Sequence, residues 1–380
     1  MLFRGKTMSP ADRSSVVEVA RTAAGFAERH IRPTAAEADH SDPRFPEEVF
    51  ARGIEAGFDR IALPEDIGGL GFHVPELCAL VETLARTCAG HAMVFGVHAA
   101  AMRALADSNG EEAGNVLDEV LPAQRPIAVC LPEPVSAEDF DAGLTALDGG
   151  AGDPRLSGSG GLAVNVGNPG FLLTFTRTSD NIPVCLLIGD GSGSLPVSTP
   201  EAVLGLRAMP MAELNLTDQS GFAWRVIARE RRALALYRSL MGDLCLATAA
   251  AASGLAQSAC DRALSYAAER YQGGRTIIDH SHLREILGGM YADTAASRGA
   301  VSAAASLTAD DPARIGTKMS VTEHAARTCT DAVQILGGYG YMRDYGLEKA
   351  MRDAAVLALL PISNARAGLW IAAIQKEALP

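Results

Sequence analysis

A long alanine-rich segment, LYRSLMGDLCLATAAAASGLAQSACDRALSYAAERY at positions 236–271, constrains the fold more than any other feature of the sequence. Its composition predicts a helix that begins near Arg232 and ends at the turn formed by Gly273 and Gly274. Small side chains let neighbouring helices approach closely, as in an antiparallel bundle. Three further helical stretches follow, at about 279–306, 313–335 and 354–378. We therefore predict that the C-terminal part of the chain is a four-helix bundle.

Helical and strand-like patterns divide the rest of the chain into two parts. The first part shows helical periodicity, for example from Val16 to Ala27, and Pro33 ends that stretch. The second part contains short apolar runs such as FLLTFTRT at 171–178, punctuated by Gly, Asp, Ser and Pro, which predicts strands and turns. We therefore predict an α+β multi-domain fold with an N-terminal all-α domain (1–125), a middle β-barrel-like domain (126–231) and a C-terminal four-helix bundle (232–380).

Composition limits the kinds of partner and compartment. The net charge of -12 argues against nucleic acid or an anionic membrane surface as the main partner. The seven cysteines are scattered without a CxxC pair, which indicates a reducing compartment and no metal site. The N-terminus lacks the apolar core of a signal peptide, and no uninterrupted apolar run reaches the length of a membrane span. These features predict a cytoplasmic protein.

Four segments, in this order and spacing, resemble one known family. They are FPEEVF at 45–50, IALPEDIGGLG at 61–71, ERYQGGRTIIDHSHL at 269–283 and QILGGYGYMRDYGLEKAMRD at 334–353. Together with the predicted order of helices, β-domain and bundle, they resemble the acyl-CoA dehydrogenases, which are FAD enzymes of fatty-acid and amino-acid breakdown. The resemblance covers nearly the whole length of the chain. It implies the fold of that family and an oligomer, either a dimer or a dimer of dimers, with FAD between subunits.

The resemblance also implies which residues contact FAD. In such enzymes a Gly-Gly-Tyr-Gly turn lets the backbone approach the flavin's pyrophosphate and adenosine, where a Cβ would collide. The corresponding residues here, which would contact the FAD of a neighbouring subunit, are Gln334, Gly337 and Gly338. Arg270 would pair with the pyrophosphate, and Gln272, Ile277 and His280 also fall on flavin-contact positions. A simpler interpretation is that the glycines only turn one helix into the next and that Arg270 caps the long helix.

The family's catalytic base is missing from its usual places. The reaction of the family needs a carboxylate that takes a proton from the carbon next to a thioester. Counting from Arg352 and Asp353, the position of that glutamate is occupied by Pro361, and the second position known in the family, on the long helix, is occupied by Leu244. Pro361, Leu244 and Leu360 would instead give the substrate pocket an apolar wall, although such a wall could equally be core packing. Asp243 lies one position from Leu244, about 100° around the helix, and is either a relocated base or a solvated helix position.

The middle domain departs from the family pattern as well. The segment PEPVSAED keeps Glu133, Pro134 and Asp139 but lacks the threonine that normally touches the flavin. Leu162 replaces the tryptophan that covers the isoalloxazine ring, and Val164 replaces a threonine. The resemblance therefore implies that the residues facing a neighbouring subunit's FAD are intact, whereas those facing the chain's own isoalloxazine are not.

Two functional hypotheses follow. In the first, the chain is the base-lacking subunit of an acyl-CoA dehydrogenase that oxidises an acyl-CoA thioester and passes electrons to an electron-transfer flavoprotein. It would complete the FAD site of a paralogous partner, although a homo-oligomer stays open. In the second, the chain is a pseudoenzyme that binds an acyl thioester or flavin without oxidation.

Overall fold

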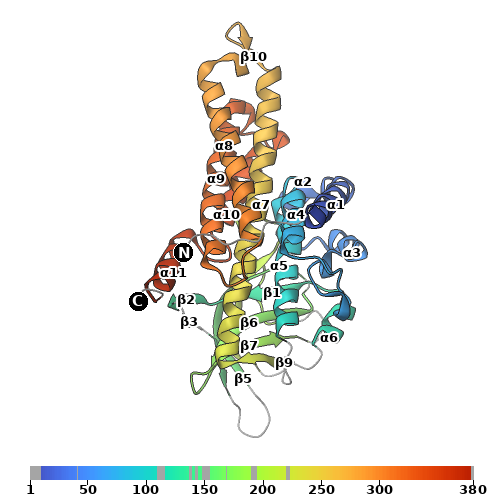
Figure 1. Ribbon diagram of the computed structural model, residues 1–380, viewed down its shortest axis with the longest axis vertical. Coiled ribbons are helices and arrows are strands. Elements are labelled where there is room, and N and C mark those ends of the chain that lie inside the picture. Colours follow the sequence, from blue (N-terminus) through green and yellow to red (C-terminus); the bar gives the residue numbers. More distant parts are fainter. Residues whose placement is uncertain are drawn as a thin grey trace.

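The computed structural model describes residues 10–40, 42–108, 116–136, 139–141, 144–147, 155–167, 169–189, 195–219 and 223–377. Figure 1 shows a tall helical bundle at one end, a sheet at the other and the N-terminal helices beside their junction. The predicted fold class is therefore confirmed: a helical N-terminal part, a curled β-sheet and a C-terminal helical bundle follow one another along the chain.

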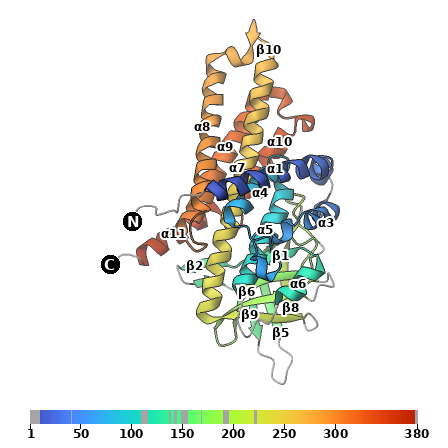
Figure 2. The same ribbon diagram turned by 45° about the vertical axis from the view of Figure 1, so that its right-hand side comes forward.

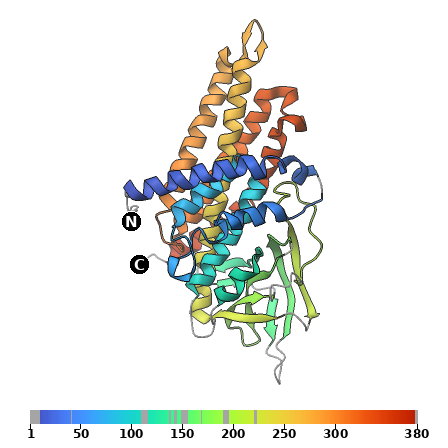
Figure 3. The same ribbon diagram turned by 90° about the vertical axis from the view of Figure 1, so that its right-hand side faces the viewer.

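The N-terminal part is built around one buried helix. Its helices are α1 (Pro10–Phe26), η1 (Ala27–Ile31), α2 (Ala35–His40), α3 (Glu47–Glu55), η2 (Phe58–Arg60), η3 (Glu65–Ile67), α4 (Val74–Ala85), α5 (Ala89–Asp107) and α6 (Val116–Ala123). Nearly all of α5 is buried, because the helix packs against α4, the sheet and the bundle. Figures 2 and 3 show α1 crossing the bundle axis, where it covers α4.

The middle part is a curled, mostly antiparallel sheet. Its strands are β1 (Ile127–Cys130), β4 (Leu144–Leu147), β5 (Arg155–Val164), β6 (Phe171–Thr178), β7 (Pro183–Ile188), β8 (Met211–Gln219) and β9 (Trp224–Arg229). Strands β1 and β4 pair with opposite ends of both β5 and β6, so they lie end to end between these two longer strands. A separate hairpin of β2 (Glu133–Ser136) and β3 (Asp139–Asp141) projects toward the last helix of the chain.

The C-terminal part is a bundle of α7 (Glu230–Glu269), α8 (Ser281–Ala304), α9 (Pro312–Leu336) and α10 (Leu347–Leu357). A short hairpin of β10 (Tyr271–Gln272) and β11 (Arg275–Thr276), followed by η4 (Ile277–Asp279), joins α7 to α8; η5 (Gly337–Tyr339) and η6 (Arg343–Tyr345) join α9 to α10. The predicted helix at 354–378 is wrong, because α10 ends at Leu357 and α11 (Asn364–Glu377) is a separate helix. Pro361 lies in the break and cannot donate a backbone hydrogen bond to a continuing helix.

Helix α7 runs through the centre of the molecule, and its close packing against neighbouring segments depends on small residues. An added Cβ at Gly254 would lie 2.0 Å from the carbonyl oxygen of Glu82 on α4, and one at Gly242 would lie 1.8 Å from that of Ala309. Within the described residues, α7 is the one helix that is long and apolar enough to cross a membrane. However, 94% of that stretch is buried inside the protein, so the helix serves here as the core of the fold.

Replacing Gly254 by alanine is expected to destabilise the protein, since the new methyl group meets backbone that cannot rotate away. The expected loss in the free energy of unfolding is on the order of 1–3 kcal/mol. Gly299→Ala on α8 is the matched control, because a Cβ there meets nothing within 4 Å and alanine favours an exposed helix. Urea unfolding of both variants measures the difference; an equal loss in both would contradict the packing explanation.

A buried ion-pair cluster joins three of these helices. Asp243 on α7 accepts a hydrogen bond from Arg103 on α5 at 3.0 Å and another from Arg314 on α9. Arg314 also donates to the carbonyl oxygen of Leu307 at 2.7 Å. Asp243 is only 6% exposed. The alternative interpretation of Asp243 as a solvated helix position is therefore wrong, because its carboxylate compensates two arginines inside the protein.

Asp243→Asn should lower the free energy of unfolding by about 3–5 kcal/mol, because it leaves the guanidinium of Arg314 buried without a counter-charge. Asp261→Asn is the control. Asp261 pairs with Arg86 at 2.7 Å, but both side chains are almost half exposed, so its loss should cost no more than about 1 kcal/mol. Chemical denaturation of both variants checks this; a cost for Asp243→Asn as small as that of the control would refute the structural role of the cluster.

Candidate functional site

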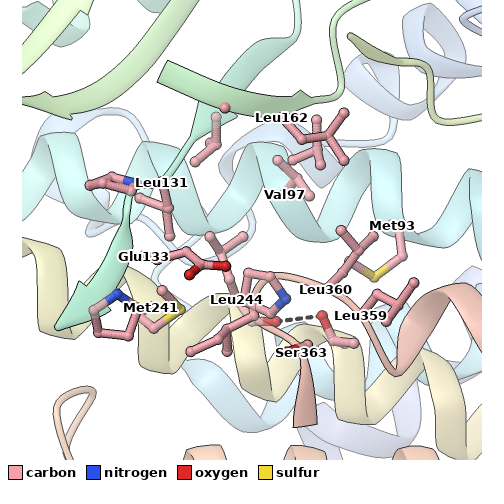
Figure 4. A pocket seen from close by; sticks show the side chains of 18 of the residues that line it. Met93, Val97, Leu131, Glu133, Leu162, Met241, Leu244, Leu359, Leu360 and Ser363 are labelled. Carbon is pink, nitrogen blue, oxygen red and sulfur yellow. Dashed lines mark hydrogen bonds between the residues drawn. The ribbon is translucent and has the colours of Figure 1, made fainter. Parts of the chain in front are cut away.

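A cavity of about 510 Å³ lies where the sheet meets α5, α7 and the segment that follows α10. Its lining is mostly apolar, as Figure 4 shows. The lining residues are Met93, Val97, Val129, Leu131, Pro132, Glu133, Pro134, Asp141, Gly161, Leu162, Val164, Met209, Met241, Leu244, Thr248, Leu359, Leu360, Pro361, Ile362 and Ser363. The volume falls within the range of ordinary small-molecule pockets.

The structure brings the three predicted pocket residues into this one cavity. Leu244 comes from the middle of α7, whereas Leu360 and Pro361 come from the segment between α10 and α11. Leu244 and Pro361, which the resemblance places at the two positions of the catalytic base, therefore face the same cavity. Neither side chain can take a proton. Thr248, one turn beyond Leu244, donates its hydroxyl to the carbonyl oxygen of Leu244 at 2.8 Å.

Two carboxylates reach the cavity from the β2–β3 hairpin. Glu133 and Asp141 face each other as Cα partners on these strands, and Figure 4 shows the carboxylate of Glu133 directed toward the cavity. Glu133 forms an ion pair with Arg366 of α11 at 3.2 Å, and its side chain is 62% exposed. Asp243 is absent from the lining, since its side chain points toward Arg103 and Arg314.

The other wall of the cavity comes from β5. Leu162 and Val164, which stand where the family has a tryptophan and a threonine, both line the cavity. Leu162 is 43% exposed. An aliphatic surface of this kind can cover a flat ring by contact but offers it no hydrogen bond.

Four of the predicted flavin contacts gather at the far tip of the bundle. Arg270 follows the last turn of α7, and its backbone carbonyl accepts a hydrogen bond from Ile277 at 2.8 Å. The ring of His280 contacts the carbonyl oxygen of Gln272 at 3.0 Å. The guanidinium of Arg270 lies 5.6 Å from the ring centre of Tyr339, and among the described residues it has no carboxylate partner. An exposed, unpaired guanidinium beside an aromatic ring suits a phosphate-bearing ligand.

The remaining three predicted contacts are next to Tyr339. Gln334 is exposed on the last turns of α9, and Gly337 and Gly338 form the turn that follows. Gly337 has a φ of 56°, a conformation that favours glycine, and an added Cβ at either glycine would meet nothing within 4 Å. This open backbone surface and Arg270 together form one cradle, to which we refer as the tip cradle (Arg270, Gln272, Ile277, His280, Gln334, Gly337 and Gly338). Its residues fit the pyrophosphate and adenosine of a dinucleotide.

The tip cradle and the cavity are far apart in one chain. Both are attached to α7, which places Arg270 about 40 Å beyond Leu244 at about 1.5 Å per residue. Figure 1 shows the β10–β11 hairpin at one end of the molecule and the sheet at the other.

Several lining residues were not predicted from the sequence. Met93 and Val97 on α5 and Met241 on α7 are buried apolar residues in helical patterns, and such residues usually belong to a core. Asp141 follows two residues after Asp139 in a segment that gave no catalytic pattern. Asp141 is recognised as a lining residue through the register of β2 with β3, which places it opposite Glu133. That register exists in the folded chain and cannot be read from the sequence.

Comparison with known proteins agrees with this architecture. The family model "Acyl-CoA dehydrogenase, C-terminal domain" matches residues 238–360, and "Acyl-CoA dehydrogenase, N-terminal domain" matches residues 15–115; together they span more than half of the chain. The chain is 28% identical over 376 residues to cyclohexane-1-carbonyl-CoA dehydrogenase of Geobacter metallireducens, covering 95% of this chain and 97% of the relative. It is 27% identical over 344 residues to acryloyl-CoA reductase (NADH) of Anaerotignum propionicum, covering 87% and 86%.

Solved structures show the same fold. Butyryl-CoA dehydrogenase of Megasphaera elsdenii has a TM-score of 0.86 at 21% identity, covering 98% of this chain and 99% of that one. The glutaryl-CoA complex of glutaryl-coenzyme A dehydrogenase has a TM-score of 0.85 at 21% identity, covering 98% and 97%. Family models, relatives and fold agree along the chain: it belongs to the acyl-CoA dehydrogenase family, whose members are FAD-binding flavoproteins.

Proposed function

We propose that this chain is the base-lacking subunit of a heteromeric acyl-CoA dehydrogenase, and that it completes the FAD site of a paralogous partner. One observation carries the proposal. Leu244 and Pro361 face the same cavity without an acid at either position, whereas the tip cradle is open and its Arg270 has no carboxylate partner within the described part of the chain. The chain thus combines an intact surface for a dinucleotide with a cavity that cannot use the family's bases.

The separation of the two regions supports a site shared between chains. The distance of about 40 Å along α7 exceeds the length of one extended FAD molecule, so one FAD cannot touch both regions of the same chain. A second subunit packed against the bundle would bring its own cavity close to the tip cradle of this one. Exposed aromatic side chains surround that tip, as expected for a subunit interface: Tyr271, Tyr291, Tyr339 and Tyr341.

In the reaction of the family, a base removes a proton beside the thioester carbonyl; FAD, when bound, would supply the acceptor for the hydride of the next carbon. This chain's residues contribute to binding. Met93, Val97 and Leu244 form an apolar pocket that can hold an acyl chain away from water, whereas the acyl group that is oxidised lies in the partner's own cavity, beside the glutamate there. Arg270 neutralises phosphate charge at the bundle tip.

Glu133 is the acid whose position most needs to be weighed against this proposal. Its carboxylate reaches the cavity, but it is held in an ion pair with Arg366 of α11 at 3.2 Å. The side chain is also 62% exposed, where water competes for any proton transfer. We therefore assign Glu133 to the cavity mouth and leave proton abstraction to the partner.

The partner is then a paralogous acyl-CoA dehydrogenase chain that carries a glutamate where this chain has Pro361. The complex acts on an acyl-CoA thioester in the cytoplasm and passes electrons to an electron-transfer flavoprotein. Two relatives whose names specify CoA thioesters, acryloyl-CoA and cyclohexane-1-carbonyl-CoA, support this substrate class.

Expression of the chain alone and together with each glutamate-bearing paralogue tests the assembly. Alone, it should show no acyl-CoA dehydrogenation; with the right partner it should co-purify as a yellow, active complex. Activity of the chain alone that disappears in Glu133→Gln would overturn the proposal, because the base would then belong to this chain. A chain that stays free of flavin in every combination would instead favour the pseudoenzyme.

Arg270→Met should lower flavin retention in the co-purified complex about tenfold, since the pyrophosphate loses a charge-assisted contact. Arg275→Met is the matched control, because Arg275 is exposed on the same hairpin but is not part of the tip cradle. Flavin absorbance per subunit after dialysis measures retention. Equal flavin content in both variants would show that Arg270 does not hold the cofactor.

A further inference from the structure

Lys318 is a buried cation that the proposed function does not use. It lies on α9 and is 0% exposed, and among the described residues it has no carboxylate partner. Burial lowers its pKa to about 8, so the amine still carries its charge at pH 7. A buried ammonium without a counter-ion needs other compensation.

That compensation comes from three oxygens of one short segment. The Nζ of Lys318 donates to the carbonyl oxygens of Ala358 at 2.8 Å and Ile362 at 2.7 Å, and to Oδ1 of Asn364 at 2.8 Å. An ammonium has three hydrogens, and each has one acceptor here. Asn364 is oriented for this contact because its Nδ2 donates to the hydroxyl of Thr322 at 3.1 Å.

The same segment forms one wall of the cavity. The cavity is lined on one side by Leu359, Leu360, Pro361, Ile362 and Ser363; Lys318 is not a lining residue but binds this segment through Ile362. The segment lies between two helices, and Pro361 has no backbone N–H with which to secure it. Its own backbone bonds are local: Leu359 donates to Val356 at 2.9 Å, Leu360 to Leu357 at 3.3 Å and Asn364 to Ala358 at 3.2 Å, and Ser363 accepts from Ala367 at 2.9 Å. These bonds stay within the α10–α11 connection, whereas Lys318 ties the wall to α9.

We propose that Lys318 is a positioning residue that fixes the wall 359–363 and thereby sets the size of acyl group that the cavity admits. The second half of this inference rests on the proposed function, because it takes the cavity as the acyl-binding site. The first half, that Lys318 holds the wall, does not. Every substitution that keeps the volume of Lys318 but removes its donors should loosen the wall while leaving the rest of α9 in place.

Hydrogen–deuterium exchange of the full chain tests the anchoring. In Lys318→Met, amides 359–364 should exchange at least about tenfold faster than in the wild type, because charged hydrogen bonds are lost, whereas amides of α9 near 325–332 should change little. Asn364→Ala, which removes one of the three acceptors, should give a smaller change at the same amides. Thr328→Val is the control: Thr328 is buried on α9, ten residues beyond Lys318, and its hydroxyl has no hydrogen-bond partner in the described part of the chain. Unchanged exchange at 359–364 in Lys318→Met, or a uniform increase over the whole bundle, overturns the anchoring.

Calorimetry tests whether the wall selects acyl groups by size. The binding of butyryl-CoA and octanoyl-CoA is measured on the same proteins or on their co-purified complexes. Lys318→Met should change the ratio of the two dissociation constants by about tenfold, and Thr328→Val should leave it unchanged. An equal loss of affinity for both thioesters in Lys318→Met would show a general structural role and refute selection. If the wild type binds neither thioester in any assembly, the proposed function fails and selection falls with it, while the exchange experiment still decides whether Lys318 holds the wall.

Discussion

The close approach of α7 to its neighbours is the constraint on which the other features depend. This helix contacts α4, α5, α8, α9 and β7. It therefore packs against the N-terminal helices, the sheet and the rest of the bundle. The approach is so close that a Cβ added at Gly254 would collide with the backbone carbonyl of Glu82. One added at Gly242 would collide with that of Ala309. Helix α7 is continuous from Glu230 to Glu269, so it carries Leu244 near its middle and presents Arg270 just beyond its end.

The continuous helix α7 keeps the cavity and the tip cradle apart within one chain. A flexible connection could fold the tip cradle back onto the cavity, but a continuous helix locked by the Asp243 cluster cannot. The two regions therefore face different ligands or the two ends of ligands held by different chains. This separation is what the proposed sharing of a site between subunits requires.

The large elements could be predicted from the sequence because their signals are local. Alanine content, glycine turns and alternating apolar residues predicted the bundle and the sheet, and the spacing of motifs located Leu244 and Pro361, which share one cavity. Partners of Asp243 could not be predicted, because Arg103 and Arg314 lie 140 and 71 residues away and nothing local marks them. Lys318 was missed for the same reason. The break at Pro361 was misread because the apolar residues on both sides continue a helical pattern, although a proline inside a helix is itself a signal of a break.

The persistence of the cavity bears on whether the chain still binds a ligand. Protein interiors are close-packed, and empty apolar volume destabilises a fold roughly in proportion to its size. A chain that served only as a scaffold would gain stability from larger side chains at Val97, Leu244 or Pro361. Instead, a space of about 510 Å³ is kept open and one of its walls is held by a buried lysine. The proposed binding of an acyl group requires such a space, whereas a chain that only supports a partner does not.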